Sequence, residues 1–248
     1  AIIEIQRPPH NFFDYALIQQ IASAMEGIDK DNNLRAAVLC SQGKSFCAGA
    51  NFNSDGTSSN QSGGSDSADR SSHLYVEAVR LFATKTPIIG AIQGAAIGGG
   101  FGLSLVPDFR VACPESRFAA NFTRLGFHPG FGLTHTLPSL IGHQKASLMF
   151  YTSRRIKGPE AYHWGLADML VPLDEVRQSA INLAQEIAEN SPLGVIETRA
   201  TMRQGLADRV RKATDHELIV QNKLRNTEDF KEGIRAVSER RVPNFTGS

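Results

Sequence analysis

The chain has 248 residues, of which 41% are hydrophobic, and 26 basic residues nearly balance 25 acidic ones to give a net charge of +1. A protein of this length buries roughly 70 to 75% of its unfolded surface, so its core needs no disulfides or metal ions for support. The balanced charge argues against nucleic acid and an anionic membrane as partners, and any anion site must be local.

The cysteines and histidines give no sign of a disulfide framework or a metal centre. Cys40, Cys47 and Cys113 cannot all pair and lie in apolar segments, which favours a reducing compartment. Neither H-E-x-x-H nor C-x-x-C occurs, so we expect no metal site. We find no signal peptide and no apolar run of membrane length, and we expect a cytoplasmic protein, with an organelle matrix as the alternative. Because the chain starts without methionine in a strand-like segment, we also expect residues upstream of it.

The first half of the chain alternates between strand-like and helical patterns. Strands are predicted around residues 3–5, 35–40 and 87–92, and helices over 12–28 and 73–84. This alternation predicts an α/β fold in which helices cover mostly parallel sheets.

A polar segment between residues 53 and 72 interrupts this alternation. It consists mainly of Ser, Gly, Asp and Asn and cannot contribute to a core. A loop of this length is usually a lid, a binding loop or disordered, and we keep lid and disorder as equal alternatives.

The last quarter of the chain is wholly helical in pattern. Helices are predicted over 174–190, 193–204, 206–225 and 227–241. Without strands of its own, this region must bury its apolar faces against the α/β core or against a neighbouring subunit. We therefore divide the chain into a core, residues 1–191, and a helical region for oligomerisation, residues 192–248.

The most informative segment runs from Ala91 to Gly102 and contains the glycine cluster Gly98–Gly100. Three successive glycines where a helix could begin indicate a loop whose backbone approaches a ligand closely. The dinucleotide motif G-x-G-x-x-G is excluded because Leu103 stands at its third glycine, and a Walker A loop because Val38 stands at its first. The chain contains no G-x-S-x-G motif, which excludes the nucleophile elbow of a serine hydrolase.

Four motifs follow one another along the chain, at residues 45–50 (SFCAGA), 91–102 (AIQGAAIGGGFG), 126–134 (GFHPGFGLT) and 158–168 (GPEAYHWGLAD). Together they resemble the enoyl-CoA hydratase/isomerase (crotonase) superfamily, and the likeness extends from Ile3 to Phe245. The resemblance implies a crotonase-like spiral of ββα units and a helical C-terminal region that builds homotrimers or hexamers. It also implies an acyl-CoA substrate from fatty acid metabolism, with coenzyme A as part of the substrate and no separate cofactor.

The resemblance implies a site in which two backbone amides hold the thioester oxygen. By motif position these amides belong to Ala48 and Gly99, while Ala50 lies near the adenine of coenzyme A and Gly100 and Phe122 contact the substrate. Preorganised amides stabilise the localised anion of a thioester enolate, at roughly 3 to 4 kcal/mol for each donor. The alternative is that both segments are only tight turns between strand and helix.

The residues that move protons in family hydratases are absent. Two glutamates do this work in such relatives, and Gly102 and Phe122 stand at their positions here. Addition of water needs one group to activate the water and another to protonate the α-carbon, so we do not expect ordinary enoyl-CoA hydration. An aspartate that some members carry a few residues later is replaced by Gly130.

His128 and Tyr75 are our candidates for proton transfer. His128 follows the strand and turn that carry the second acid in relatives, and imidazole suits proton transfer near neutral pH. Tyr75 belongs to the helix that borders the acyl pocket in the family. The alternatives are that His128 only hydrogen-bonds its own turn and that Tyr75 is a core tyrosine with a hydrogen-bonded hydroxyl.

Other side chains receive weaker roles. His73, Asn121 and Thr123 could orient water, and Cys47 is treated as a small apolar residue because nothing suggests a lowered pKa. Arg241, next to Arg240, stands where relatives place a cation for the phosphates of coenzyme A; the alternative is a solvated helix end.

Two functions remain open at this point. The first is an enzyme that binds an acyl-CoA thioester and stabilises its enolate, as a lyase, isomerase or hydrolase acting on an unusual acyl group. The second is a catalytically silent acyl-CoA-binding or scaffold protein.

Overall fold

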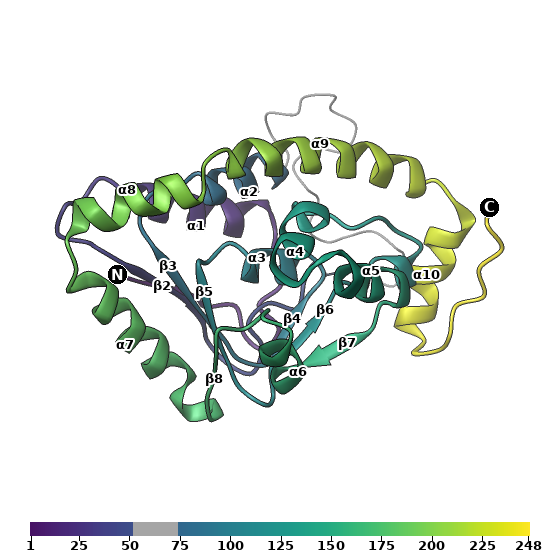
Figure 1. Cartoon of the computed structure of the whole chain (residues 1–248). Coiled ribbons are helices and arrows are strands. Elements are labelled where there is room, and N and C mark those ends of the chain that lie inside the picture. Colours follow the sequence, from purple (N-terminus) through teal and green to yellow (C-terminus); the bar gives the residue numbers. More distant parts are fainter. Residues whose placement is uncertain (52–73) are drawn as a thin grey trace.

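The computed structural model describes residues 1–51 and 74–248, and within them two sheets form the framework (Figure 1). The larger sheet has the order β1-β2-β3-β5-β8, with every neighbouring pair parallel; its strands are β1 (Ile2–Ile5), β2 (Ala37–Ser41), β3 (Ile88–Ile92), β5 (Phe109–Ala112) and β8 (Met169–Leu170). In the smaller sheet β6 pairs with β4 in parallel and with β7 in antiparallel; these strands are β4 (Ala95–Ile97), β6 (Arg117–Ala119) and β7 (Arg155–Lys157).

The helices of the described residues lie around these sheets: α1 (Tyr15–Ile28), α2 (Leu74–Phe82), α3 (Gly99–Ser104), α4 (Leu133–Ile141), α5 (His143–Thr152), α6 (Gly158–His163), α7 (Val176–Ala188), α8 (Pro192–Met202), α9 (Leu206–Leu224), α10 (Glu228–Ser238) and the short 3₁₀ helices η2 (Thr123–Leu125) and η3 (Leu173–Glu175). The expected α/β class with mostly parallel strands is confirmed. The expected lid or disordered loop, residues 53–72, lies outside the described residues.

Both faces of the larger sheet are covered, which explains the continuous apolar runs of its strands. Alternate strand residues point to opposite faces. Ala37 and Leu39 join the main core, which α1 and α2 share, whereas Val38 and Cys40 join a second cluster beneath α7. A parallel sheet buried on both sides requires such continuous apolar strands.

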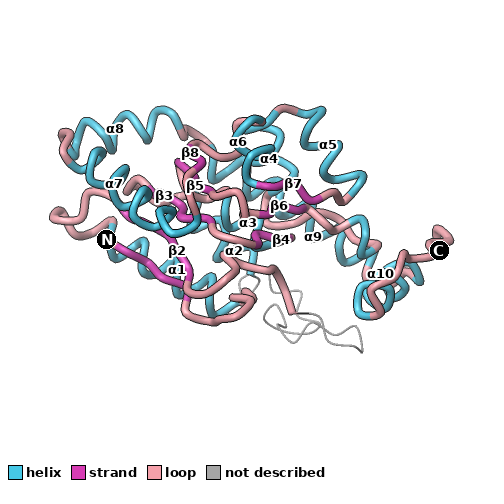
Figure 2. The backbone as a smooth tube through the Cα atoms, turned by 90° about the horizontal axis from the view of Figure 1, so that it is seen from below, coloured by secondary structure: helices cyan, strands magenta, loops and turns pink. Residues whose placement is uncertain are grey.

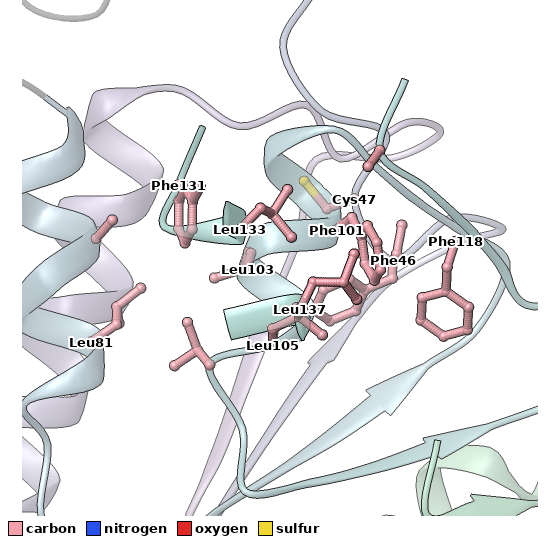
Figure 3. Packing of buried hydrophobic residues seen from close by; sticks show 14 of the residues in the cluster. Phe46, Cys47, Leu81, Phe101, Leu103, Leu105, Phe118, Phe131, Leu133 and Leu137 are labelled. Atoms are coloured by element: carbon pink, nitrogen blue, oxygen red, sulfur yellow. The ribbon is translucent and has the colours of Figure 1, made fainter. Parts of the chain in front are cut away.

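The main core is centred on aromatic and aliphatic side chains around α3 (Figure 3). Phe101 of α3 packs against Phe118 of β6 with ring centroids 5.7 Å apart. Phe131 and Leu133 approach the same helix from the segment that leads into α4. The α3 helix is therefore fixed by packing on several sides.

A buried arginine ties the larger sheet to the segment before β8. Arg110 of β5 is fully buried, and its guanidinium donates to the carbonyl oxygens of Leu166 at 2.6 Å and Pro107 at 2.8 Å. Its charge is balanced by Asp168, whose carboxylate lies 3.2 Å from the guanidinium. A buried charge is tolerated because its hydrogen bonds and its ion pair are satisfied.

The C-terminal helices pack on the core of the same chain. In Figure 1, α8 and α9 run across the top of the molecule, and α10 lies at the end opposite α7 and α8 in both views (Figures 1 and 2). The α9 helix packs against α2 and α4, and α10 packs against η2. No helix in the described part of the chain is long and apolar enough to cross a membrane. The division at residue 191 and the role of residues 192–248 in oligomerisation stay predictions.

Candidate functional site

The glycine cluster forms a sharp turn between β4 and α3. Gly98 has φ 57° and ψ −122°, a backbone conformation that favours glycine, and α3 begins at the next residue. The amides of Gly99 and Gly100 stand in the first helical turn, where no intrahelical acceptor exists. Neither amide donates a hydrogen bond to the residues that the structure describes. This turn therefore presents free donors.

The first motif lies directly beside this turn. Cys47 donates its amide to the carbonyl oxygen of Ala95 at 2.9 Å and accepts from Ile97 at 3.0 Å, extending the smaller sheet by one bridge. Gly49 has φ 87°, and a β-carbon there would lie 2.7 Å from the Ile97 oxygen and 4.0 Å from the Gly99 nitrogen. The two segments that the sequence analysis paired are thus neighbours in space.

The assignment of Ala48 as an oxyanion donor is wrong. Its amide donates to the carbonyl oxygen of His10 at 3.0 Å and so is not free for a ligand. The amide of Gly49 donates to the Cys47 sulfur. Ala50 is the next residue, and its amide makes no hydrogen bond within residues 1–51 and 74–248. Motif position alone could not distinguish these amides, because their availability depends on the chain near His10.

Aromatic rings surround the turn. A β-carbon on Gly99 would lie 2.2 Å from the Phe13 ring, so this ring rests directly on the glycine. Phe13 meets Phe131 edge to face, with ring centroids 6.1 Å apart. Phe122 is only 8% exposed and its Cζ lies near Gly98. The surroundings of the turn are therefore largely aromatic, with one polar neighbour, the Asn121 Oδ1, 3.4 Å from the position of a β-carbon on Gly98.

Phe131 fills the space beside Gly102, the residue that the resemblance places at the first glutamate of family hydratases. A β-carbon on Gly102 would lie 2.7 Å from Cβ and 2.8 Å from Cδ1 of Phe131. Phe131 is 1% exposed and has φ 62°, so both its ring and its backbone are held in place. The motif at residues 126–134 does not single out Phe131, because nothing in it shows which ring turns toward Gly102.

Tyr75 is engaged on both sides of its hydroxyl group. The hydroxyl donates to Oε1 of Gln221 at 2.8 Å and accepts from the amide of Phe131. A β-carbon on Gly130 would lie 1.9 Å from this oxygen, so the tyrosine occupies the space that a side chain at residue 130 would need. Burial raises the pKa of Tyr75 well above its usual value. These contacts favour the alternative of a core tyrosine.

His128 lies against its own turn and α9. Its Nδ1 is 2.8 Å from the carbonyl oxygen of Pro129, and its own carbonyl oxygen accepts from Nε2 of Gln221 at 2.9 Å. The ring meets His216 of α9 edge to face at 6.2 Å. The contacts of His128 given by the structure are with the turn and α9, which agrees with the alternative of a histidine that holds its turn.

Glu217 is a buried carboxylate close to these residues that sequence reasoning did not place. It accepts from the amide of Gly132 at 2.8 Å, the amide of Thr134 at 3.0 Å and the Thr134 hydroxyl at 2.6 Å. It therefore caps the N-terminus of α4 from α9, where a negative charge is stabilised by the helix. Burial raises its pKa, which three donors only partly offset. Its oxygens serve the helix end rather than a substrate.

Arg241 is neutralised by neighbouring acids. Its guanidinium binds the Glu232 carboxylate at 2.5 and 3.0 Å and the Glu239 carboxylate at 2.5 Å. The assignment as a cation for coenzyme A phosphates is therefore not supported within this chain, and the structure agrees with a helix end held by its own ion pairs.

The remaining candidates divide between buried and undescribed positions. Burial raises the pKa of Cys47 to about 12, in agreement with a small apolar role. The Thr123 hydroxyl donates to the carbonyl oxygen of Phe150 at 2.6 Å and is not directed at a ligand. His73 lies outside the described residues. Among those that are described, no group of three or more His, Cys, Asp or Glu side chains could hold a metal ion.

Comparison with known proteins identifies the family of this chain. The model of the enoyl-CoA hydratase/isomerase family matches residues 1–248. A crotonyl-CoA hydratase of Syntrophomonas wolfei is 30% identical over 248 residues, which cover 99% of this chain and 94% of that protein. A solved carnitinyl-CoA hydratase from Mycobacterium avium has a TM-score of 0.85 at 26% identity and covers 100% of this chain and 95% of its own. An enoyl-CoA hydratase structure from Geobacillus kaustophilus has a TM-score of 0.73 at 31% identity, with 100% and 94% covered. The chain therefore belongs to the enoyl-CoA hydratase/isomerase family.

Proposed function

We propose that this protein binds an acyl-CoA thioester and stabilises its enolate with the backbone amides of Ala50 and Gly99. The observation that carries the proposal is the close approach of Gly49 to Gly99, together with the amides of Ala50 and Gly99, which donate to no acceptor within residues 1–51 and 74–248. Each such donor contributes about 3 to 4 kcal/mol to a developing oxyanion in a site that excludes water. Phe13, Phe122 and Phe131 supply that dry surrounding.

The same site does not support hydration by two carboxylates. Gly102 and Phe122 cannot move protons, and the space beside Gly102 is taken by Phe131. The hydratases named above are relatives, and their reactions are not transferred to this chain.

We therefore favour a reaction that needs an electron sink but no general base. When a thioester carries a carboxylate on its α-carbon, the bond between these carbons can break with release of carbon dioxide. The electron pair then passes to the thioester as its enolate, and water supplies the proton to the α-carbon afterwards. This step requires only an oxyanion site and an apolar pocket. Apolar walls stabilise the substrate carboxylate poorly, which favours its loss as neutral carbon dioxide.

The second candidate is the silent acyl-CoA-binding or scaffold protein. The observation that favours it is the complete engagement of the Tyr75 hydroxyl and of the Glu217 carboxylate in structural hydrogen bonds. Under this alternative the thioester binds but is not converted.

Steady-state turnover on a panel of thioesters separates these functions. The panel contains crotonyl-CoA, a 3-enoyl-CoA, malonyl-CoA and methylmalonyl-CoA, and binding of each is measured by calorimetry. We expect Ala50→Pro, which removes one donor, to lower kcat/KM by about 10²- to 10³-fold, while Ala50→Gly keeps activity. Tyr75→Phe and His128→Ala are expected to retain turnover. If thioesters of the panel bind but none is converted, the silent alternative is established. Full activity of Ala50→Pro would refute the oxyanion site.

We also propose that the protein is a homotrimer or a dimer of trimers. Leu193 and Met202 of α8 are 74% and 82% exposed, and a subunit interface over α8 would cover both side chains. Light scattering on the wild type and on Met202→Lys tests this, and a monomer at micromolar concentration would contradict it.

A further inference from the structure

A cleft of about 770 Å³ lies at the carboxyl ends of β2, β3 and β5, apart from the glycine turn. Leu173 contributes exposed apolar surface to it, with the buried residues Ala91 and Val176 behind the lining. Positive charge comes from Lys44, Arg117, Lys157 and Arg177. Its volume falls in the range of roughly 300 to 1,000 Å³ that is usual for small-molecule sites. The carboxyl edge of parallel strands is also where ligands commonly bind in α/β proteins.

Several of these cations have no partner in the described structure. Arg117 and Lys157 are directly opposite each other in the antiparallel pair β6–β7. Like charges in this arrangement are destabilising. Neither side chain forms an ion pair or hydrogen bond within residues 1–51 and 74–248, and the same holds for Lys44. An anion between them would relieve the repulsion.

The other charges leave the cleft positive. Arg177 is paired with Glu4, and Glu115 is an acidic residue on the lining. The cations come from the loop after β2, the start of β6, the end of β7 and the first turn of α7. A ligand there would be contacted by cations from four segments of the chain.

This cleft and the candidate oxyanion site lie at opposite ends of β4. Gly94, before the strand, lines the cleft, whereas Gly99 follows the strand. A strand of three residues spans about 10 Å. The lining of the cleft does not include Ala50 or Gly99. It also does not include the aromatic residues Phe13, Phe122 and Phe131.

We propose that this cleft is a second binding site, for a small organic phosphate. Arginine and lysine side chains together suit a phosphoryl group, since arginine offers paired donors and lysine a compact charge. Leu173, which is 49% exposed on the lining of the cleft, supplies an apolar surface for the organic part of the ligand. The site is independent of the acyl-CoA function proposed above.

Calorimetric titration of the full-length protein with phenyl phosphate and with inorganic phosphate tests the site. We expect phenyl phosphate to bind more tightly, because only this probe uses the apolar surface. The Arg117→Gln, Lys157→Gln double variant is expected to weaken both probes by about tenfold or more. Arg155→Gln is the matched control, because Arg155 is an exposed cation on the same strand β7 but does not line the cleft.

The outcomes are distinct. Equal affinity of the double variant and the wild type would overturn the site, and equal loss in Arg155→Gln would show a general charge effect instead. Equal affinity for phenyl phosphate and inorganic phosphate would overturn the proposal that the ligand is an organic phosphate. A matching loss of acyl-CoA affinity in the double variant would overturn the claim of a separate site. Without added phosphate, the double variant is expected to melt at or above the wild-type temperature, which shows that any lost binding does not come from unfolding.

Discussion

Replacing Gly102 with alanine tests whether Phe131 fills the space beside residue 102. The added β-carbon would lie 2.7, 2.8 and 2.9 Å from the Cβ, Cδ1 and Cγ atoms of Phe131, so the ring or the helix must shift. Overpacking of this kind costs about 1 to 3 kcal/mol. Alanine recovers about 0.5 to 1 kcal/mol relative to glycine in a helix interior. In a Phe131→Gly background the clash disappears and only this gain remains.

A double-mutant cycle isolates the clash. We expect a coupling free energy of about 1 to 3 kcal/mol between Gly102→Ala and Phe131→Gly, and a smaller coupling with Phe131→Ala, which keeps the close Cβ atom. The free energies of unfolding come from urea titrations followed by circular dichroism. Gly27→Ala is the control, because a β-carbon there meets nothing within 4 Å and stabilises both backgrounds alike. Additivity of the two substitutions within about 0.5 kcal/mol would refute the placement of Phe131.

Three further predictions concern buried groups. Because burial raises the pKa of Glu217, the native state binds more protons than the unfolded state between the ordinary and the raised value. The free energy of unfolding then falls as pH rises through that window. We expect Glu217→Gln to flatten this pH dependence in urea titrations between about pH 4 and 7. An unchanged pH dependence in the variant would contradict this role of Glu217. Arg110→Met leaves buried carbonyl oxygens unpaired and is expected to cost about 3 to 5 kcal/mol in the same titration, whereas a loss below about 1 kcal/mol would argue against the buried network. Cys40, Cys47 and Cys113 are buried and free, so a thiol reagent at pH 8 is expected to label none of them before unfolding, and rapid labelling of the native protein would contradict this burial.

The sequence predicts the elements of this fold well because their signals are local. The four C-terminal helices begin and end within three residues of the predicted bounds, since their apolar spacing and their breaks at residues such as Pro192 and Gly205 mark them directly. The glycine turn was also located correctly, because its backbone conformation requires glycine. These features depend on neighbours along the chain.

The partners of each site atom could not be predicted in the same way. Whether Ala48 or Ala50 has a free amide depends on the carbonyl oxygen of His10, which is distant in sequence. The carboxylate that caps α4 comes from Glu217, 85 residues away from Gly132. Such contacts are set by tertiary packing, and one sequence carries no periodic signal for them.

Gly102 and Gly130, which the resemblance places at acidic positions of relatives, are linked to one another by packing. The space that a side chain at residue 102 would occupy is filled by Phe131. The space that a side chain at residue 130 would occupy is filled by the Tyr75 hydroxyl. A simple loss of acidic side chains would leave cavities, which are costly in a close-packed interior. Here the amide of Phe131 also donates to Tyr75, so the two replacements support each other. A glutamate placed at residue 102 alone would therefore bury an unpaired carboxylate against an aromatic ring, so we do not expect this single change to produce hydratase activity.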